Sequence, residues 1–335
     1  MKRLLYLAYY LRRMNWDLLR RFMRHVEARN GISPSRQVVA MVVNSLRYNV
    51  SPLEVYQFGF FGADKIEKGR WAGTGTMYEF QRHANPPGER AILDDKRKFH
   101  DAYRKFFRHE VVTLQEMEED RTLALRMLER YSELVFKPAQ GNCGGGLVFA
   151  ASAQLNAENL PDWMRARGLD LVEESIRQHP DFQALSPSAV NTVRIFTCLD
   201  SSDRCQILGC RLRISVNSSV DNMAAGNMAA PVDEVTGRVC GPGVYSDITK
   251  TPETVHPVTG VPIEGFQIPY WPESLALVRE AAVLHPQNRS IGWDIVITPD
   301  GPGLIEGNHD WCKLVWQLPV GQGLKHMLGE CALNG

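Results

Sequence analysis

A glycine-rich segment in the middle of the chain has the residue types of a phosphate-binding loop. Between Leu134 and Val148, Lys137 and Pro138 end an apolar run that predicts a strand, four glycines follow, and a second strand is predicted. Glycine lets backbone N–H groups approach phosphate oxygens closely, and a lysine adds positive charge beside them. The spacing is not that of a P-loop, and no helix is predicted after the glycines. The segment is therefore either a phosphate-binding loop or a tight β-hairpin in which glycine only permits the turn.

Acidic and amide side chains occur in a predicted strand pair near the C-terminus. The turn from Pro299 to Pro302 separates two short apolar runs, so the two strands would be antiparallel. That pairing brings Asp294 close to Glu306 and Asn308, which would share a face because they are two residues apart in a strand. Two carboxylates and an amide oxygen are ligands that suit Mg²⁺ held jointly with phosphates. The alternative is that these side chains only cap the open end of a hairpin.

The predicted elements change type along the chain. Residues 1–90 have helical spacing, and a helix pair is predicted at 95–108 and 116–130. One later helix is predicted at 273–284. Helices first and mixed strands later indicate an α+β fold with a helical N-terminal region. Short β-branched or alternating runs predict strands at 133–137, 146–150, 170–176, 190–199, 206–216, 291–298 and 302–306.

The N-terminus has the strongest charge asymmetry in the sequence. Residues 1–36 hold nine Lys and Arg against two acids, whereas the whole chain holds 38 of each. Apolar residues from Leu4 to Val26 recur at spacings of three, four and seven, which predicts a basic amphipathic helix that ends at Gly31. Either this helix is docked on the body with a solvated basic face, or it contacts an acidic partner or a membrane surface.

Length and composition limit the class of protein. The 335 residues are 44% hydrophobic and 23% charged, as in ordinary globular proteins. A net charge of zero gives no overall field to hold nucleic acid, so no nucleic-acid partner is expected. Seven cysteines without a CxxC pair favour a cytoplasmic location over a disulfide scaffold or a zinc site. The apolar run Leu4–Leu11 is too short for a membrane span, and none is expected.

Together, the glycine-rich segment and the acidic strand pair resemble the ATP-grasp superfamily. Four further segments are similar to its sugar-transfer associated branch, namely Gln178–Pro180, Ser188–Arg194, His256–Gly260 and Gly292–Asp294. The resemblance implies an ATP-grasp fold in which two α+β lobes hold a nucleotide between them. The implied boundaries are a helical region at 1–90 and an ATP-grasp domain at 91–335, with a lid lobe at about 130–180 and a catalytic lobe at about 181–320.

The resemblance also implies roles for individual residues. Lys96 and Lys137 would bind the α- and β-phosphates beneath a glycine lid, and Arg194 would act near the transferred phosphate together with Lys137. From their alternation on a strand, Arg211 and Arg213 would share one side, where they either clamp a substrate carboxylate or lie on an exposed strand face. Asn222 either borders the phosphates or belongs to a surface loop. The expected nucleotide-binding residues are Lys96, Lys137, Gly141, Gly144, Gly145, Gly146, Glu173, Glu174, Ile176 and Asn222, and the expected metal ligands are Asp294, Glu306 and Asn308.

The function that the resemblance implies is that of a ligase. Such a protein would use ATP with two Mg²⁺ ions, or Mn²⁺ in their place, to turn a small carboxylic acid into an acyl phosphate that an amine captures. Its partners would be that carboxylate and amine, and its assembly a homodimer. Two alternatives stay open: a kinase acting on a sugar or glycan hydroxyl, and a nucleotide-binding scaffold without turnover. Many members carry an α/β domain ahead of the first lysine, whereas residues 1–90 predict helices, so the acceptor site stays unassigned.

Overall fold

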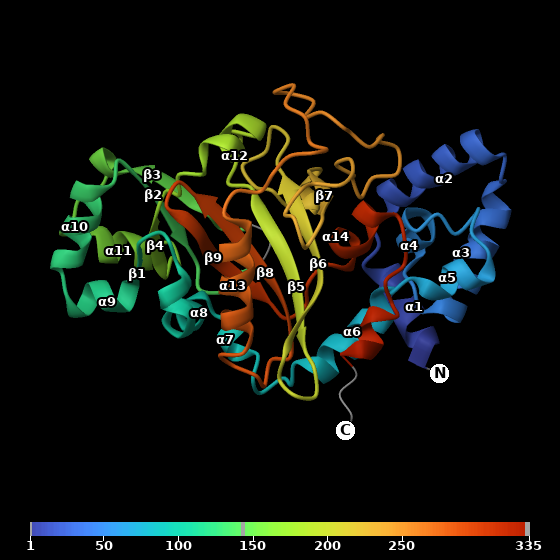
Figure 1. Ribbon diagram of the computed structural model, residues 1–335, viewed down its shortest axis with the longest axis horizontal. Helices are drawn as coiled ribbons and strands as arrows, with labels where there is room; N and C mark the ends of the chain where they lie inside the picture. The colour runs from blue at the N-terminus through green and yellow to red at the C-terminus, as the bar shows by residue number, and fades with distance from the viewer. Residues whose placement is uncertain (1, 142–144, 332–335) are drawn as a thin grey trace.

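The computed structural model describes residues 2–141 and 145–331, which form two β-sheets with helices around them (Figure 1). The smaller sheet and its helices lie at one end of the long axis, the helices of residues 2–70 at the other, and the larger sheet between them. This arrangement confirms the α+β class that the order of the elements predicted. Within the described residues, no helix has the length and apolar character needed to cross a membrane.

The N-terminal region is helical, but the single helix expected at its start is in fact two helices. Asn15 interrupts it because its side chain accepts a hydrogen bond from the Leu18 N–H (3.0 Å) and so caps a new helix. That helix ends at Gly31, as predicted, in the left-handed conformation with φ 66°. The helices are α1 (Lys2–Arg12), α2 (Trp16–Asn30), α3 (Pro34–Tyr48), α4 (Pro52–Gln57), α5 (Lys65–Arg70), α6 (Thr74–Ala84), α7 (Ala91–Asp94) and α8 (Lys96–Tyr103).

The smaller sheet is antiparallel and has the strand order β1-β4-β2-β3. Its alternate residues Leu134, Phe136 and Val172 are buried in an apolar cluster with residues of the three helices beside it. Val135 and Glu173, which pair across the sheet, therefore face the other way. The elements are β1 (Val111–Thr113), α9 (Leu114–Glu119), α10 (Thr122–Arg130), β2 (Glu133–Lys137), β3 (Val148–Ala151), α11 (Leu160–Arg165) and β4 (Leu171–Glu174).

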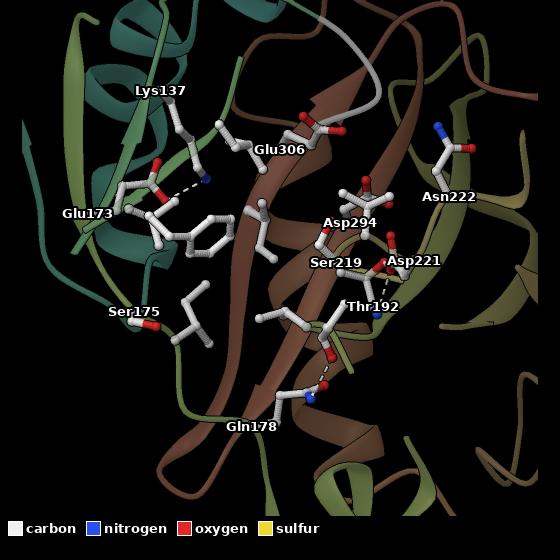
Figure 2. A pocket seen from close by; sticks show the side chains of 18 of the residues that line it. Lys137, Glu173, Ser175, Gln178, Thr192, Ser219, Asp221, Asn222, Asp294 and Glu306 are labelled. Atoms are coloured by element: carbon white, nitrogen blue, oxygen red, sulfur yellow. Dashed lines mark hydrogen bonds and ion pairs between the residues drawn. The ribbon is translucent and has the colours of Figure 1, made fainter. Parts of the chain in front are cut away.

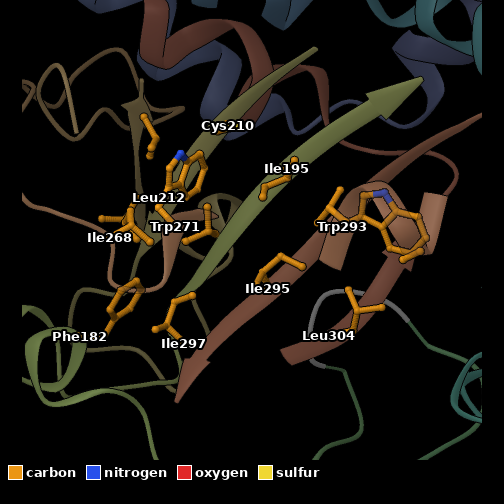
Figure 3. Packing of buried hydrophobic residues seen from close by; sticks show 14 of the residues in the cluster. Phe182, Ile195, Cys210, Leu212, Ile268, Trp271, Trp293, Ile295, Ile297 and Leu304 are labelled. Carbon is orange, nitrogen blue, oxygen red and sulfur yellow. The ribbon is translucent and has the colours of Figure 1, made fainter. Parts of the chain in front are cut away.

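The larger sheet is also antiparallel, with the strand order β7-β6-β5-β8-β9. One face packs in the main apolar core, where Ile195, Leu212, Trp293 and Ile295 lie with Trp271 (Figure 3). The elements are α12 (Pro180–Leu185), β5 (Thr192–Leu199), β6 (Cys205–Ile214), β7 (Met228–Val232), α13 (Trp271–Ala282), β8 (Ser290–Thr298), β9 (Gly301–Asn308), α14 (Lys313–Gln317) and α15 (Met327–Glu330).

The opposite face of the larger sheet is covered in two parts. Towards one end, Phe196 packs against Trp311 and Trp316, next to α14. Towards the other end, the same face carries Arg194 and Asp294, which are direct partners across β5 and β8. This second part lies opposite the smaller sheet, so the polar residues of both sheets meet between the two lobes.

Candidate functional site

A cavity of about 600 Å³ lies between the two sheets. Figure 2 shows Lys137, Glu306 and Asp294 towards one end of it, and Ser175 and Gln178 towards the other. The lining combines apolar side chains with charged ones, a composition suited to a ligand with a flat apolar part and an anionic part. Apolar lining residues are Val135, Leu147, Phe149, Ile176, Val190 and Ile305; charged ones include Lys96, Lys137, Glu173, Arg213, Asp221, Asp294 and Glu306.

Lys137 is held by a buried carboxylate on the neighbouring strand. Its Nζ lies 2.5 Å from Oε2 of Glu173, and His109 Nε2 lies 3.3 Å from the same oxygen. Burial alone would raise the pKa of Glu173, but Lys137 and His109 outweigh burial and lower the pKa to about 2. Glu173 is therefore an ionised carboxylate that fixes the direction of the Lys137 ammonium, with His109 as its second partner.

Glu174 and the segment after β4 border the cavity, but the Glu174 carboxylate is engaged by a backbone group. The Glu174 carboxylate accepts a hydrogen bond from the Glu110 N–H (3.0 Å), on the side of β1. Ser175 Oγ donates to the Glu133 carboxylate (2.9 Å), and both residues line the cavity. Ile176 lines it as well. Backbone groups, Ser175 and Ile176 are thus better placed than the Glu174 carboxylate to contact a ligand at this end.

The glycine-rich segment meets Lys96 at its described edge. Lys96 Nζ donates to the Gly141 carbonyl (2.7 Å), and the Lys96 N–H donates to the Ala139 carbonyl (2.9 Å). Gly141 and Gly145 line the cavity. Gly146 adopts φ 81°, and a Cβ there would come within 3.1 Å of Pro138, so glycine is required. Gly144 lies outside the described residues. Burial lowers the pKa of Lys96.

A β-bulge shapes the acidic part of the cavity. Asp294 pairs with Glu306, but Ile295 pairs with Leu304, so Ile305 is an extra residue in β9. Neighbouring strand residues normally point to opposite faces, yet both Ile305 and Glu306 line the cavity. The bulge therefore supplies an apolar contact and a carboxylate from adjacent positions.

Asn308 completes the acidic cluster, as the strand spacing predicted. Its Nδ2 donates to Oε1 of Glu306 (3.1 Å), and it lines a smaller adjoining cavity together with Lys96 and Glu306. Burial raises the pKa of Glu306, and the nearby charge of Asp294 raises it further. Glu306 makes no ion pair with any described residue.

Two arginines and two aspartates form a buried chain of alternating charge. Arg194 binds both carboxylate oxygens of Asp294, one of them through Nη2 at 2.8 Å. Arg213 bridges Asp294 (2.8 Å) and Asp221 (2.6 Å). Burial alone would raise the pKa of Asp294, but Arg194 and Arg213 outweigh it and hold that pKa well below its usual range. Asp221 also accepts hydrogen bonds from Thr192, through its N–H at 2.9 Å and its hydroxyl at 2.5 Å.

Arg194 is placed to orient Asp294 and does not line the cavity itself. Gly292, the cross-strand partner of Phe196, leaves room for the Arg194 side chain. A Cβ on Gly292 would lie 3.3 Å from Arg194 Cδ and 2.6 Å from Trp311 Cβ. Arg213 does line the cavity. Of the two arginines in this network, Arg213 is therefore the one exposed to a ligand.

Arg211 is not brought to the cavity. It is the cross-strand partner of Arg194, but its guanidinium extends towards the end of α14. There Nε and Nη2 donate to the Trp316 carbonyl at 2.9 and 2.5 Å, and Nη1 donates to the Cys210 carbonyl at 2.7 Å. Burial lowers its pKa to about 10. Arg211 therefore binds the last turn of a short helix. It neither lines the cavity as a carboxylate clamp nor lies on an exposed strand face, because its side chain is buried.

Asp221 is a site residue that sequence reasoning did not single out. It precedes Asn222, which lines the cavity and caps a short turn by accepting from the Ala224 N–H (3.0 Å). Burial raises the pKa of Asp221. The sequence offered one indication of Asp221, its position beside Asn222, which was a candidate. The ion pair of Asp221 with Arg213 could not be predicted, because it depends on a contact between distant segments.

The acidic cluster fits Mg²⁺ in its donor types. Glu306 and Asp294 offer carboxylate oxygens beside the Asn308 amide, and hard oxygen donors are what Mg²⁺ prefers. Burial first, and then the nearby charge of Asp294, raise the pKa of Glu306, and a divalent cation would offset both effects. Across residues 2–141 and 145–331, no group of three or more His, Cys, Asp and Glu side chains is arranged to hold a metal. The remaining ligands would be phosphate oxygens and water.

Comparison with protein families identifies a match over most of the chain. A family model described as sugar-transfer associated ATP-grasp matches residues 76–332. No curated protein matches the sequence. The family match agrees with the resemblance that the glycine-rich segment and the acidic strand pair carry.

Solved structures of similar shape are distant in sequence. The ADP complex of an N5-carboxyaminoimidazole ribonucleotide synthetase has 12% identity and a TM-score of 0.39, with 65% of this chain and 45% of that chain aligned. The D-alanine-D-alanine ligase from Coxiella burnetii has 12% identity and a TM-score of 0.35, with 65% of this chain and 48% of that chain aligned. The biotin carboxylase from Campylobacter jejuni has 12% identity and a TM-score of 0.45, with 87% of this chain and 60% of that chain aligned. The chain thus spans about half the length of the first two.

Proposed function

The chain belongs to the sugar-transfer associated ATP-grasp family, and from that premise we propose that it is an ATP-dependent ligase. It would activate a small carboxylic acid as an acyl phosphate and couple it to an amine, releasing ADP and phosphate. The observation that carries the proposal is the cavity between the sheets, which joins an apolar lining to Lys96, Lys137 and the acidic cluster.

The cavity supports a nucleotide bound along its length. An adenine ring would lie among the apolar lining residues near Ile176, and its phosphates would extend towards Lys96 and Lys137. Glu173 keeps the Lys137 ammonium pointing into the cavity, which reduces the reorganisation needed when the phosphates bind. When bound, Mg²⁺ would neutralise phosphate charge, with Glu306, Asp294 and Asn308 as the protein ligands.

In the first step, an oxygen of the substrate carboxylate would attack the γ-phosphorus, and the bond to the β-phosphate oxygen would break to release ADP. The neutral amine nitrogen would then attack the acyl carbon and form a C–N bond. Phosphate would leave with the C–O electron pair and take up the proton that the nitrogen loses. Arg213 lines the cavity beside the acidic cluster and is suited to orient the incoming carboxylate. Arg194 would act as a positioning residue through Asp294.

The protonation chemistry favours a carboxylate over a hydroxyl as the attacking group. A hydroxyl needs a base to remove its proton, whereas a carboxylate is already anionic near pH 7. Among the described carboxylates at the charged end, Glu173, Asp221 and Asp294 each contact a cation. Glu306 makes no such ion pair, and as a metal ligand it would not be free to act as a base.

Hydroxylamine trapping tests the reaction without knowledge of the natural amine. Purified protein, ATP and Mg²⁺ would be incubated with a panel of small carboxylic acids and hydroxylamine, and hydroxamate, ADP and phosphate would be measured. We expect hydroxamate with at least one acid, with one ADP and one phosphate for each. Lys137→Ala should abolish it, whereas Lys98→Ala, an exposed lysine on α8, should retain it. In a parallel incubation with sugars in place of the acids, ADP without free phosphate, together with a phosphorylated sugar, would instead identify a kinase.

A further inference from the structure

Helix α3 turns its polar side to the protein and its valines to the solvent. Gln37, Met41, Asn44 and Ser45 are buried, and Gln37 Nε2 donates to the carbonyls of Met23 (3.1 Å) and Ile32 (2.7 Å). The residues between them face outward, which is the reverse of an ordinary surface helix. The exposed valines are Val38, Val39, Val42 and Val43, with Val39 63% and Val43 52% exposed.

A shallow groove on this helix combines the valines with positive charge. Val39, Ala40 and Val43 line it, next to residues of α5. The charged residues that line the groove are all cations, namely Arg36, Arg47, Lys65 and Lys68. None of these four makes an ion pair with a described residue. We call the four valines, Ala40 and these four cations the α3 face.

The acids nearest in sequence cap the helix that carries Lys65 and Lys68, and they offset part of its positive charge. Asp64 accepts hydrogen bonds from the N–H groups of Ile66 (2.7 Å) and Glu67 (2.8 Å). Glu67 in turn accepts from the Asp64 N–H (3.4 Å), which completes the capping box of α5. Neither acid makes an ion pair with these lysines, and α5 with its cap holds Lys65, Lys68 and Arg70 against Asp64 and Glu67, so the net charge beside α3 stays positive.

The region around the α3 face is also positively charged and has exposed apolar side chains. Arg3 donates to the carbonyls of Leu46 (2.9 Å) and Arg47 (2.8 Å), which joins α1 to the end of α3. On α1, Leu4 and Leu5 are also exposed. Residues 1–70 hold thirteen Lys and Arg against five acids, whereas residues 71–335 hold 25 against 33. The neutral chain is therefore polarised, with apolar side chains exposed at its positive end.

We propose that the α3 face is a docking surface for a membrane that contains anionic phospholipid. Exposed aliphatic side chains between unpaired cations match the boundary between acyl chains and anionic headgroups. The positive end of a polarised chain would also orient the molecule towards a negative surface before contact. This inference does not depend on the reaction in the cavity, because the α3 face shares no residue with its lining.

Vesicle co-sedimentation of the full chain tests this docking surface. We expect binding to vesicles of phosphatidylcholine and phosphatidylglycerol about tenfold above binding to phosphatidylcholine alone, and its loss at high salt. The variants Val39→Asp with Val43→Asp, and Arg36→Ala with Lys68→Ala, should each reduce binding at least about fivefold.

Matched variants make the test specific. Val235 is 83% exposed outside the α3 face, so Val235→Asp should bind as the wild type does, and so should Arg121→Ala with Arg167→Ala. Unchanged thermal stability would show that the α3 variants are folded. No preference for anionic vesicles, or equal loss in the matched variants, would overturn the proposal. So would sedimentation velocity showing a dimer that only the Val39→Asp/Val43→Asp variant dissolves, since the face would then join two copies of the chain.

Discussion

The cavity and the α3 face both carry cations, but the surroundings of those cations differ. In the cavity, Lys137 lies 2.5 Å from a buried carboxylate, and Arg213 lies between two aspartates. On the α3 face, the four cations have no acidic partner among the described residues and stand beside exposed valines. Chemistry on a phosphoryl group requires charges fixed in direction, and neighbouring carboxylates supply that order. Attraction to an anionic surface requires only charge, so fixing the direction of the cations on the α3 face would bring no advantage.

This difference has an energetic consequence. A buried cation and its carboxylate depend on each other, so removing either one leaves an uncompensated charge. An exposed lysine loses little when it is replaced, because water solvates its surroundings in both states. Substitutions in the two regions should therefore separate effects on function and stability.

The largest expected effect is on turnover in the cavity. Lys137→Ala removes an ammonium that lines the cavity and would bind the phosphates, and we expect kcat/KM for ATP to fall by about 10²–10³-fold. Lys68→Ala removes an equal charge from the α3 face and should leave kcat/KM in solution unchanged. Steady-state ADP release measures both. A similar loss in the two variants would remove the distinction between the regions.

Glu173→Gln should give the largest effect on stability. It leaves Lys137 and His109 buried without their carboxylate, which should cost about 3 kcal/mol at pH 7 in urea unfolding. Because the pKa of Glu173 is lowered from 4.5 to about 2, the ionised carboxylate stabilises the fold above pH 4.5 and loses that effect as the pH falls towards 2. The difference between wild type and variant should shrink over that range. A difference independent of pH would contradict the charge argument.

Glu306→Gln should have a smaller effect of opposite sign on stability. The raised pKa of Glu306 means that its charged form is disfavoured in the fold, so neutral glutamine should raise the Tm by about 1–3 °C at pH 7. The gain should disappear at acidic pH, where wild-type Glu306 is protonated in both states. Scanning fluorimetry at several pH values checks this, and a lower Tm at pH 7 would show that the carboxylate stabilises the fold.

The family and the α+β fold could be predicted because they depend on local patterns in the right order. Two hairpins each carry a pattern that spacing along the chain reveals: Lys137 with its glycines in one, and Asp294 with Glu306 in the other. The structure brings both patterns to one cavity. The short strands β1 and β7 were missed, since three and five residues carry little periodic signal.

What could not be predicted depends on contacts between distant segments. Strand alternation places Arg211 and Arg213 on one side of β6, but not the direction in which each long side chain bends. Arg211 reaches a carbonyl 105 residues away, and Arg213 reaches Asp294, 81 residues away. The role of Glu173 as the partner of Lys137 likewise follows from the register between β2 and β4.

Calorimetric titration with a non-hydrolysable ATP analogue, with and without Mg²⁺, would show whether the cavity is the nucleotide site. The wild type and the Arg36→Ala/Lys68→Ala variant should bind with equal affinity in the micromolar range and require Mg²⁺, whereas Lys137→Ala and Glu306→Gln should lose binding. No binding by the wild type at millimolar analogue, or undiminished binding by both cavity variants, would contradict the assignment of the cavity as the nucleotide site.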